Sequence, residues 1–285
     1  MKHAYLVVAH HQFDILIKTI KILDDENNDF YIHIDKKSSN VPFEDIVNAA
    51  KHSKVTFISR MNVNWGGYSQ IKCTLCLLKE ASKQKYDYMH FISGVDLPIK
   101  SKDEIFTFFE THRGEEFVEV KGEEIEPQYL ERIRRHTVFR DITQIKALYR
   151  VDSLIHVIER LLKIDRLKGN PSTKFLYGSN WFSITYAFAQ YVLQQEAWID
   201  KTFSQSLCAD ELFIQTLLEN SAFKANITRE SCMNARKIDF GRGNPYVWRQ
   251  ADFDELIHSN ALFARKFDEN IDNVIINQIY EYCLE

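Results

Sequence analysis

Several polar side chains of this sequence could bind a nucleotide-linked ligand, because each follows a run of apolar residues. His10 and His11 follow the first run, Asp35 follows the second, and Asp96 follows a third. Imidazole and carboxylate groups can form hydrogen bonds with the N–H and hydroxyl groups of a base or a sugar. Each of these side chains could instead cap a helix, and His10 could equally be a hydrogen-bonded core histidine.

The surrounding sequence alternates between short apolar segments and amphipathic ones, as in a parallel sheet flanked by helices. Apolar strands are expected at residues 4–10, 30–35, 54–59 and 88–94, and helices at residues 13–24, 44–52 and 68–83. The pattern predicts an α/β fold with a Rossmann-like parallel sheet in the N-terminal half. Ligands of such sheets bind beyond the carboxyl ends of the strands, where the polar residues above would lie.

The second part of the chain is expected to continue the same unit and to cover these strand ends. Its pattern predicts helices at residues 102–112, 151–163 and 209–221, and strands near residues 115–122 and 235–242. We therefore expect residues 1–285 to form a single domain.

Composition excludes some classes of protein. The chain has 36 basic and 40 acidic residues and a net charge of −4, which argues against a general nucleic-acid binder. No stretch reaches the roughly 20 apolar residues that are needed to cross a bilayer. The five cysteines are irregularly spaced and fit reduced thiols. We expect a cytoplasmic protein that could associate peripherally with a membrane.

Seven blocks of the sequence together resemble one enzyme family. They are "YLVVAHHQFDILIKTI", "FYIHIDKKS", "VNWGGYSQIKCTLCLL", "FISGVDLPIKS", "GSNWFSIT", "DELFIQTLL" and "NALFARKFD". In this order they are similar to the core-2/I-branching β-1,6-N-acetylglucosaminyltransferases, glycosyltransferase family 14, which includes the protein O-xylosyltransferases. The absence of a membrane anchor and of a disulfide set suits a bacterial member that acts in polysaccharide biosynthesis.

The resemblance implies a GT-A type fold and inverting transfer from a UDP-sugar, without a DxD motif, a divalent metal or another cofactor. In the family an arginine and a lysine stabilise the departing UDP, and they match Arg236 and Lys266. Preorganised cations can do this in place of a metal ion. The literal DxD of this sequence, Asp252 to Asp254, reads instead as an exposed helix start, where acids favour the helix dipole.

The resemblance also assigns the remaining site residues. The family's general base matches Glu211 at the start of a helix, and we assign the neighbouring Asp210 to the helix cap. Asp35 matches the nucleotide-contacting aspartate, and the segment with His10 lies where the uracil would rest. Asp96 is expected to face the donor sugar or its ribose.

Acceptor binding is expected in the second part, since residues 1–100 would bind the nucleotide and residues 101–285 the acceptor. Glu119 and Arg132 fall near positions where related enzymes hold their acceptor galactose. The basic cluster Arg132, Arg134, Arg135 and His136 could instead meet an anionic sugar or a lipid phosphate, or be a solvated basic face.

The resulting hypothesis is a metal-independent inverting glycosyltransferase that moves a sugar, expected to be N-acetylglucosamine, from a UDP-sugar to a glycan or lipid-linked oligosaccharide. The alternative is a non-catalytic nucleotide-sugar or glycan-binding protein of the same fold. A sugar-phosphate hydrolase would need paired carboxylates or metal ligands, and the sequence shows no such cluster.

Overall fold

The apolar runs near the N-terminus form the parallel part of a six-stranded sheet. A computed structural model describes residues 1–143, 145–230 and 232–285. The sheet order is β3 (Lys54–Phe57), β2 (Asn28–Ile34), β1 (His3–Ala9), β4 (Tyr88–Ser93), β7 (Phe182–Thr185) and β6 (Phe117–Val118). Strands β3, β2, β1 and β4 are parallel, whereas β7 runs antiparallel to β4 and β6. The predicted α/β class with a Rossmann-like N-terminal half is confirmed.

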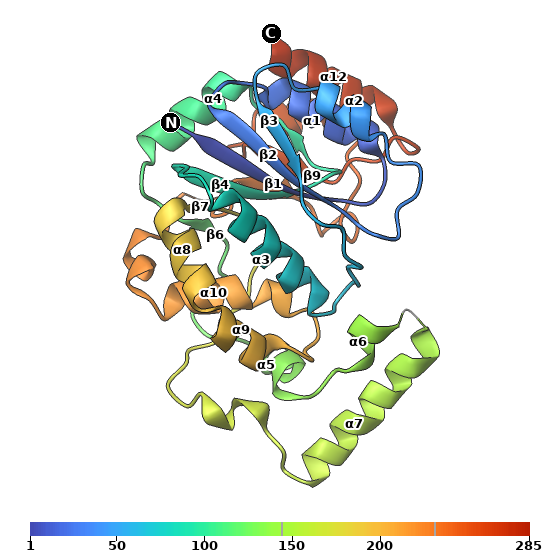
Figure 1. The fold of residues 1–285 in the computed structure, drawn as a ribbon, viewed down its shortest axis with the longest axis vertical. Helices are drawn as coiled ribbons and strands as arrows, with labels where there is room; N and C mark the ends of the chain where they lie inside the picture. The colour runs from blue at the N-terminus through green and yellow to red at the C-terminus, as the bar shows by residue number, and fades with distance from the viewer. Residues whose placement is uncertain (144, 231) are drawn as a thin grey trace.

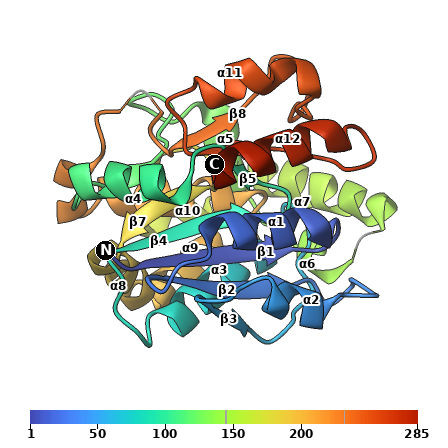
Figure 2. The same cartoon turned by 90° about the horizontal axis from the view of Figure 1, so that it is seen from above.

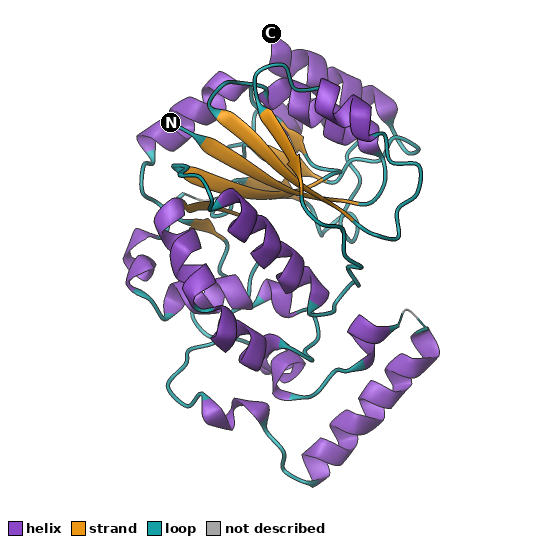
Figure 3. Cartoon of the chain, viewed as in Figure 1, coloured by secondary structure: helices purple, strands orange, loops and turns teal. Residues whose placement is uncertain are grey.

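Side chains of the sheet alternate between two hydrophobic cores, one on each face. In β1, Tyr5 and Val7 belong to the first core, and Ala4 and Leu6 belong to the second. This is the two-residue period of a strand, and helices on both faces keep the central strands dry. Figure 3 shows the sheet between the two helical layers.

The first face is covered by helices from both ends of the chain and by α4 (Lys102–Thr111) (Figures 1 and 2). The helices from the two ends are α1 (Phe13–Leu23), α2 (Phe43–Asn48), α11 (Phe253–Ile257) and α12 (Asn273–Leu284). Helix α1 buries Ile15, Leu16, Thr19, Ile20 and Leu23, a spacing that puts these residues on one side of a helix. A capping box between Ser101 and Glu104 fixes the start of α4.

The second face is covered mainly by helices of the middle of the chain. These are α3 (Ser69–Ala81), α8 (Tyr186–Gln194), α9 (Glu196–Phe203) and α10 (Phe213–Glu219). The helix expected at residues 209–221 is divided, because residues 209–211 form the 3-10 helix η3 (Ala209–Glu211) and α10 begins at Phe213. Glu211 therefore ends a 3-10 turn and does not begin an α-helix.

A second, three-stranded sheet brings the C-terminal part of the chain to the end of β4. Its order is β5 (Leu97–Pro98), β9 (Phe263–Arg265) and β8 (Arg236–Ile238). Strand β9 is antiparallel to β5 and parallel to β8. Because β5 follows Asp96 directly, this pairing sets the residues after β9 beside the carboxyl end of β4.

Some of the remaining helices lie apart from the sheet (Figure 1). The remaining helices are α5 (Pro127–Arg134), α6 (Phe139–Ile142), α7 (Tyr149–Leu161) and the 3-10 helices η1 (Lys146–Leu148), η2 (Arg166–Gly169), η4 (Ala222–Asn226) and η5 (Gln250–Asp252). Of the helices described, none has the length and apolar character to span a membrane.

Candidate functional site

The polar residues expected at the strand ends do lie at the carboxyl edge of the parallel strands. His10 follows β1, Asp35 follows β2, and Asp96 lies three residues after β4. The Asp35 carboxylate accepts hydrogen bonds from the backbone N–H groups of Lys37 (2.8 Å) and Val63 (3.3 Å). The Lys37 ammonium lies 3.3 Å from the same carboxylate. Asp35 thus organises the loop at this edge of the sheet.

His10 lies at the surface of this edge. Its side chain is exposed, and its ring centroid is 4.0 Å from that of His11. Partial desolvation, followed by the neighbouring His11, lowers the pKa of His10. The alternative that His10 is a core histidine is therefore wrong, and its ring is open to a ligand.

Asp96 is buried and pairs with an arginine that sequence reasoning missed. Arg265 Nη1 donates to Asp96 Oδ1 at 2.9 Å, and the Ser93 N–H donates to Asp96 Oδ2 at 2.8 Å. The Arg265 guanidinium also stacks on the Trp181 ring, 4.5 Å from its centroid. Two anchors therefore fix Arg265, although its side chain stays 21% exposed. The only local signal is its place next to Lys266 in "FARKFD", and Arg236 shares that signal because it precedes Lys237.

Lys266 follows Arg265 and is half-buried. Its backbone N–H donates to the Tyr246 carbonyl, and its carbonyl accepts from the Trp248 N–H. None of the residues that the structure describes pairs with its ammonium group. Lys266 therefore offers an unneutralised charge at the residue after Arg265, whose own charge is paired with Asp96.

Arg236, the other predicted phosphate ligand, lies in the core and is 5% exposed. Its guanidinium donates to the carbonyls of Phe91 (3.2 Å) and Phe182 (2.7 Å) and to Ser183 Oγ (2.9 Å). Burial lowers the pKa of Arg236 to about 10. These contacts clamp β8 to β4 and β7. The phosphate role of Arg236 stays a prediction that this arrangement does not favour.

The predicted base and a predicted acceptor residue meet across 79 positions of sequence. Arg132 Nη1 donates to Glu211 Oε2 at 2.7 Å. The Arg132 guanidinium lies 4.7 Å from the Tyr129 ring centroid, and Tyr129 stacks on Tyr177 at 3.7 Å. The other carboxylate oxygen of Glu211 has no partner among the described residues. The sequence did not point to Tyr129 and Tyr177.

Asp210 does not cap a helix, which corrects the sequence-based assignment. Neither η3 nor α10 has a side-chain cap. The Asp210 carboxylate accepts from Gln70 Nε2 at 2.9 Å and Asn180 Nδ2 at 3.2 Å, while its Oδ1 is buried without a described partner. Burial, followed by the charge of Glu211, raises the pKa of Asp210 to about 7. Asp210 thus links α3 to the turn that carries Glu211.

Gly178 packs between the backbone carbonyls of Glu119 and Glu211. The Gly178 N–H donates to the Glu211 carbonyl at 2.9 Å. On the other side, a Cβ at position 178 would lie 1.9 Å from the Glu119 carbonyl oxygen, so only glycine fits there. Of the two predicted acceptor residues, Arg132 contacts the carboxylate of the predicted base, whereas the backbone of Glu119 lies next to Gly178.

Residues 178–181 connect the two halves of this site. Gly178 contacts Glu211, and Trp181 carries the stacked Arg265. Three residues of extended chain span at most about 11 Å. Residues 178–181 therefore link the turn that carries Glu211 to the tryptophan that packs against Arg265.

The rest of the basic cluster is neutralised internally. Arg134 pairs with Glu131 (3.0 Å) and Asp165 (3.3 Å), and Arg135 pairs with Glu131 (3.4 Å). The ring of His136 pairs with Glu159. The cluster is thus an ion-pair network and not the simple solvated face that was one alternative, and its free capacity for an anionic acceptor is small.

The literal DxD segment does start a helix, as expected. Asp252 accepts from the Arg249 N–H (2.9 Å), the Tyr246 hydroxyl (3.0 Å) and Arg242 (2.7 Å). Asp254 is exposed, but Asp252 is buried, which corrects the expectation of an exposed pair. Within the described residues, no group of three His, Cys, Asp or Glu side chains could hold a metal ion. Metal independence itself stays a prediction.

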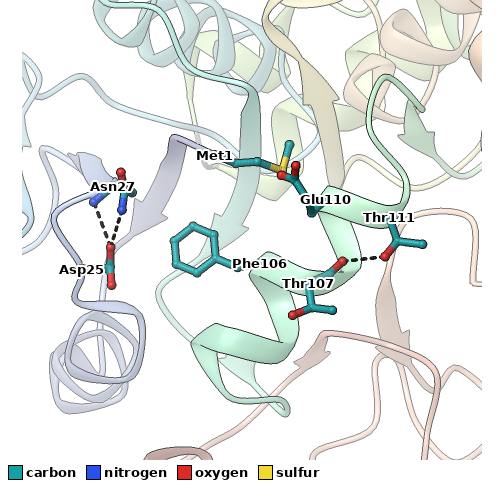
Figure 4. A pocket seen from close by; sticks show the side chains of 7 residues that line it. All are labelled: Met1, Asp25, Asn27, Phe106, Thr107, Glu110 and Thr111. Carbon is teal, nitrogen blue, oxygen red and sulfur yellow. Dashed lines mark hydrogen bonds between the residues drawn. The ribbon is translucent and has the colours of Figure 1, made fainter.

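A pocket of about 420 Å³ lies elsewhere, at the amino-terminal edge of the sheet (Figure 4). Met1 precedes β1, Asn27 precedes β2, and Phe106 and Thr107 belong to α4. It is therefore at the opposite end of the strands from His10, and it has no part in the site described above.

Comparison with known proteins agrees with the resemblance in the sequence. Mouse xylosyltransferase 2 is 23% identical over 299 residues, covering 96% of this chain and 32% of the relative. Mouse N-acetyllactosaminide beta-1,6-N-acetylglucosaminyl-transferase is 24% identical over 296 residues, covering 94% of this chain and 69% of the relative. The chain thus spans about a third of the length of the xylosyltransferase that it matches.

Likeness to solved structures is weaker. Mouse xyloside xylosyltransferase 1, in its apo form, has a TM-score of 0.43 at 9% identity, covering 92% of this chain and 96% of that one. Core-mannan synthase A from Aspergillus fumigatus, in an Mn/GDP form, has a TM-score of 0.40 at 13% identity, with coverages of 79% and 72%. Scores this low support no argument about the site.

The family model gives the decisive comparison. The model described as Core-2/I-Branching enzyme matches residues 3–249, which is most of the sequence. The match includes the strand ends, the segment 178–181 and Glu211, and ends before Arg265. This chain belongs to the core-2/I-branching enzyme family.

Proposed function

We propose that this protein is a metal-independent inverting glycosyltransferase that moves a sugar from a UDP-sugar to a glycan hydroxyl. The observation that carries the proposal is the arrangement along residues 178–181. The Glu211 carbonyl accepts from Gly178 at one end of this segment, and Arg265, which precedes Lys266, stacks on Trp181 at the other end. A carboxylate base and fixed cations are the groups that inverting transfer without a metal requires.

Glu211 is the proposed general base. Arg132 holds its Oε2, which orients the carboxylate, and Oε1 is left to take the proton of an acceptor hydroxyl. The oxygen of that hydroxyl then attacks the anomeric carbon from the side opposite the leaving UDP, so the configuration inverts. Glu119 and the stacked Tyr129 and Tyr177 are suited to contact the acceptor sugar.

Lys266 and Arg265 are the proposed partners of the departing diphosphate. Positive groups that are already in place stabilise the charge as the glycosidic bond breaks. Arginine offers a planar fork and lysine a compact charge. In this proposal His10 and Asp35 bind the nucleoside, Asp96 orients Arg265, and Arg236 supports the strands beneath.

The proposed donor is a UDP-sugar, and two relatives suggest which sugars to test first. One is named a xylosyltransferase and the other an acetylglucosaminyl-transferase. The sequence reasoning favoured N-acetylglucosamine, whereas the xylosyltransferase relatives favour a pentose. The acceptor is a glycan or a lipid-linked oligosaccharide, and a cytoplasmic, bacterial enzyme of polysaccharide biosynthesis is part of the proposal.

UDP release from UDP-xylose and UDP-N-acetylglucosamine, with EDTA or with Mn²⁺, tests the proposal. We expect release to persist in EDTA. Glu211→Gln should lower turnover at least about a hundredfold with little change in UDP affinity, because it removes only the base. Lys266→Ala should weaken UDP binding itself. Glu110→Gln, an exposed change on α4, is the matched control. Full activity of Glu211→Gln, or strict dependence on Mn²⁺, would contradict the mechanism.

A nucleotide-sugar-binding protein without turnover is the second candidate. The ion pair between Arg132 and Glu211 favours it, since a carboxylate held by a guanidinium is less available as a base. Calorimetric binding of a UDP-sugar without any UDP release, over a panel of donors and glycan acceptors, would identify this case.

A further inference from the structure

A helical segment between α5 and β7 lies outside the body of the protein. Residues 137–143 and 145–170, which we call the hairpin, contain α6, η1, α7 and η2. In Figure 1, α7 lies apart from the helices that cover the sheet and faces the rest of the molecule along one side only. Its 13 residues make a ridge about 20 Å long.

The outer side of this ridge is apolar. Leu154 and Leu161 are 58% and 77% exposed. The exposed apolar side chains of the hairpin are Ile142, Ile145, Val151, Leu154, Val157, Ile158, Leu161, Leu162 and Ile164. Those of α7 recur at helical spacing, so they form one continuous stripe. Together with the other exposed apolar side chains of the hairpin, this stripe is a candidate interaction surface.

The acidic residues of α7 point the other way. Asp152 is buried and accepts from the backbone N–H groups of Val138 (2.8 Å) and Phe139 (3.2 Å). Glu159 is buried and binds the ring and backbone N–H of His136. The polar side of the helix thus attaches it to the protein, and the apolar side faces outward. The stripe therefore does not pack against the rest of the protein.

Among the described side chains of the hairpin, the exposed charged ones are the acidic Asp141 and the basic Arg150, Arg160, Lys163 and Lys168. Arg160 also lies 3.6 Å from Glu131. Asp141 and Asp165 are engaged within the protein, because Asp141 binds the N–H groups of Tyr68 and Ser69, and Asp165 binds Arg134. The outer surface therefore combines a continuous apolar stripe with cationic flanks.

We propose that the hairpin docks on the surface of an anionic phospholipid bilayer. An apolar stripe flanked by Lys and Arg is the pattern of a helix that lies in the membrane interface, with its apolar side among the upper acyl chains. The basic residues complement anionic headgroups. This proposal does not depend on the proposed reaction.

A second copy of the chain fits this surface less well. A ridge about 20 Å long and 10 Å wide offers roughly 200 Å², far below the roughly 800 Å² per partner of a stable interface. A two-fold dimer would also bring the same cations of both copies together. Docking on a bilayer, unlike docking on a second protein, needs no groove that fits the ridge and no matching pattern of opposite charges.

Docking would also orient the candidate site. The hairpin begins three residues after α5, which carries Arg132. Asp141 ties it to residues 68–69, next to the loop that contacts the Glu211 turn. The acceptor side of the site would therefore lie close to the lipid headgroups.

Flotation with lipid vesicles tests this proposal. The whole protein is mixed with vesicles of phosphatidylcholine alone or of phosphatidylcholine with phosphatidylglycerol. We expect flotation with the anionic vesicles only, weakening as salt is raised. Leu154→Glu/Ile158→Glu should reduce binding about tenfold or more, because it places charge in the apolar stripe. Arg150→Glu/Lys163→Glu should reduce it comparably.

Matched variants control for charge and exposure. Val47→Glu/Val274→Glu changes two exposed apolar residues on α2 and α12, and Lys51→Glu/Lys85→Glu reverses two exposed charges elsewhere. Both should float like wild type. Circular dichroism and thermal unfolding of every variant check that it is folded, which we expect because each changed side chain is exposed.

Three outcomes would overturn the proposal. They are a lack of flotation by wild type, equal flotation with neutral vesicles, and equal flotation of the hairpin variants and their controls. Sedimentation velocity tests whether a second copy of the chain covers the stripe instead. If wild type is a dimer that does not bind vesicles, and Leu154→Glu/Ile158→Glu is a monomer, the stripe is a dimer interface.

Discussion

Replacing Asp210 with asparagine should change how stability depends on pH. The Asp210 carboxyl is 6% exposed, and burial, followed by the charge of Glu211, raises its pKa from 3.8 to about 7. The unfolded chain releases this proton near the ordinary pKa, whereas the folded protein keeps it to about neutral pH. Raising the pH therefore favours the unfolded state, and the wild type loses stability between roughly pH 4 and pH 7.

The size of this effect follows from the two pKa values. One pKa unit corresponds to about 1.4 kcal/mol, so the full effect is about 4 kcal/mol. Between about pH 5 and pH 8 the loss is about 2 to 3 kcal/mol, because part of the unfolded-state titration lies at lower pH. In Asp210→Asn the amide oxygen can still accept from Gln70 and Asn180, but the side chain cannot ionise.

Urea unfolding of both proteins at about pH 5 and about pH 8 provides the measurement. The variant should gain about 2 to 3 kcal/mol relative to wild type on going to the higher pH. Burial also raises the pKa of Glu116, to about 7, but this group is the same in both proteins and cancels in the difference. Asp254→Asn, at an exposed acid, should show no such gain. A difference between wild type and Asp210→Asn that is independent of pH would refute the reasoning.

Three further substitutions test individual contacts. Arg236→Met should lower the free energy of unfolding by at least about 2 kcal/mol, because it leaves the buried carbonyls of Phe91 and Phe182 without this hydrogen-bond donor. An unchanged urea midpoint would contradict the role of Arg236 in holding the strands together. Gly178→Ala should cost about 1 to 3 kcal/mol and lower transfer at least about tenfold, since its Cβ would overlap the Glu119 carbonyl; wild-type turnover would argue against this contact. Trp181→Ala should weaken UDP binding about 2- to 30-fold by removing the ring under Arg265, and calorimetry showing equal affinity would exclude that support.

The N-terminal half of the fold was predictable because its signals are local. The apolar runs at residues 4–10 and 88–94 became β1 and β4, and the expected helix at residues 13–24 became α1. Continuous apolar segments of strand length, alternating with amphipathic helices, have few other solutions than a parallel sheet. The edge of the sheet at which His10, Asp35 and Asp96 lie followed from the strand directions alone.

The partners of the site residues were not predictable, because they depend on contacts between distant parts of the chain. Arg132 and Glu211 are 79 positions apart, and the pairing of β5 with β9 brings Arg265 to Asp96 over 169 positions. Sequence reasoning selected Lys266 by its motif but could not distinguish a buried arginine at position 236 from a more accessible one at position 265. Nothing local separates them, since each is the middle residue of an Ala-Arg-Lys tripeptide.

In the proposed mechanism, the Arg132–Glu211 ion pair has to leave Glu211 able to act as a base. The two side chains are 25% and 34% exposed, so water screens the pair and its net contribution is of the order of 1 kcal/mol or less. In a fully buried pair the carboxylate could not leave the guanidinium to bind an acceptor hydroxyl, because breaking the pair would leave a buried charge without a partner. At this exposure an acceptor hydroxyl can approach Oε1 while the guanidinium keeps Oε2, or displace the guanidinium at small cost. Partial exposure therefore lets the same arginine orient the carboxylate and leave it able to accept a proton.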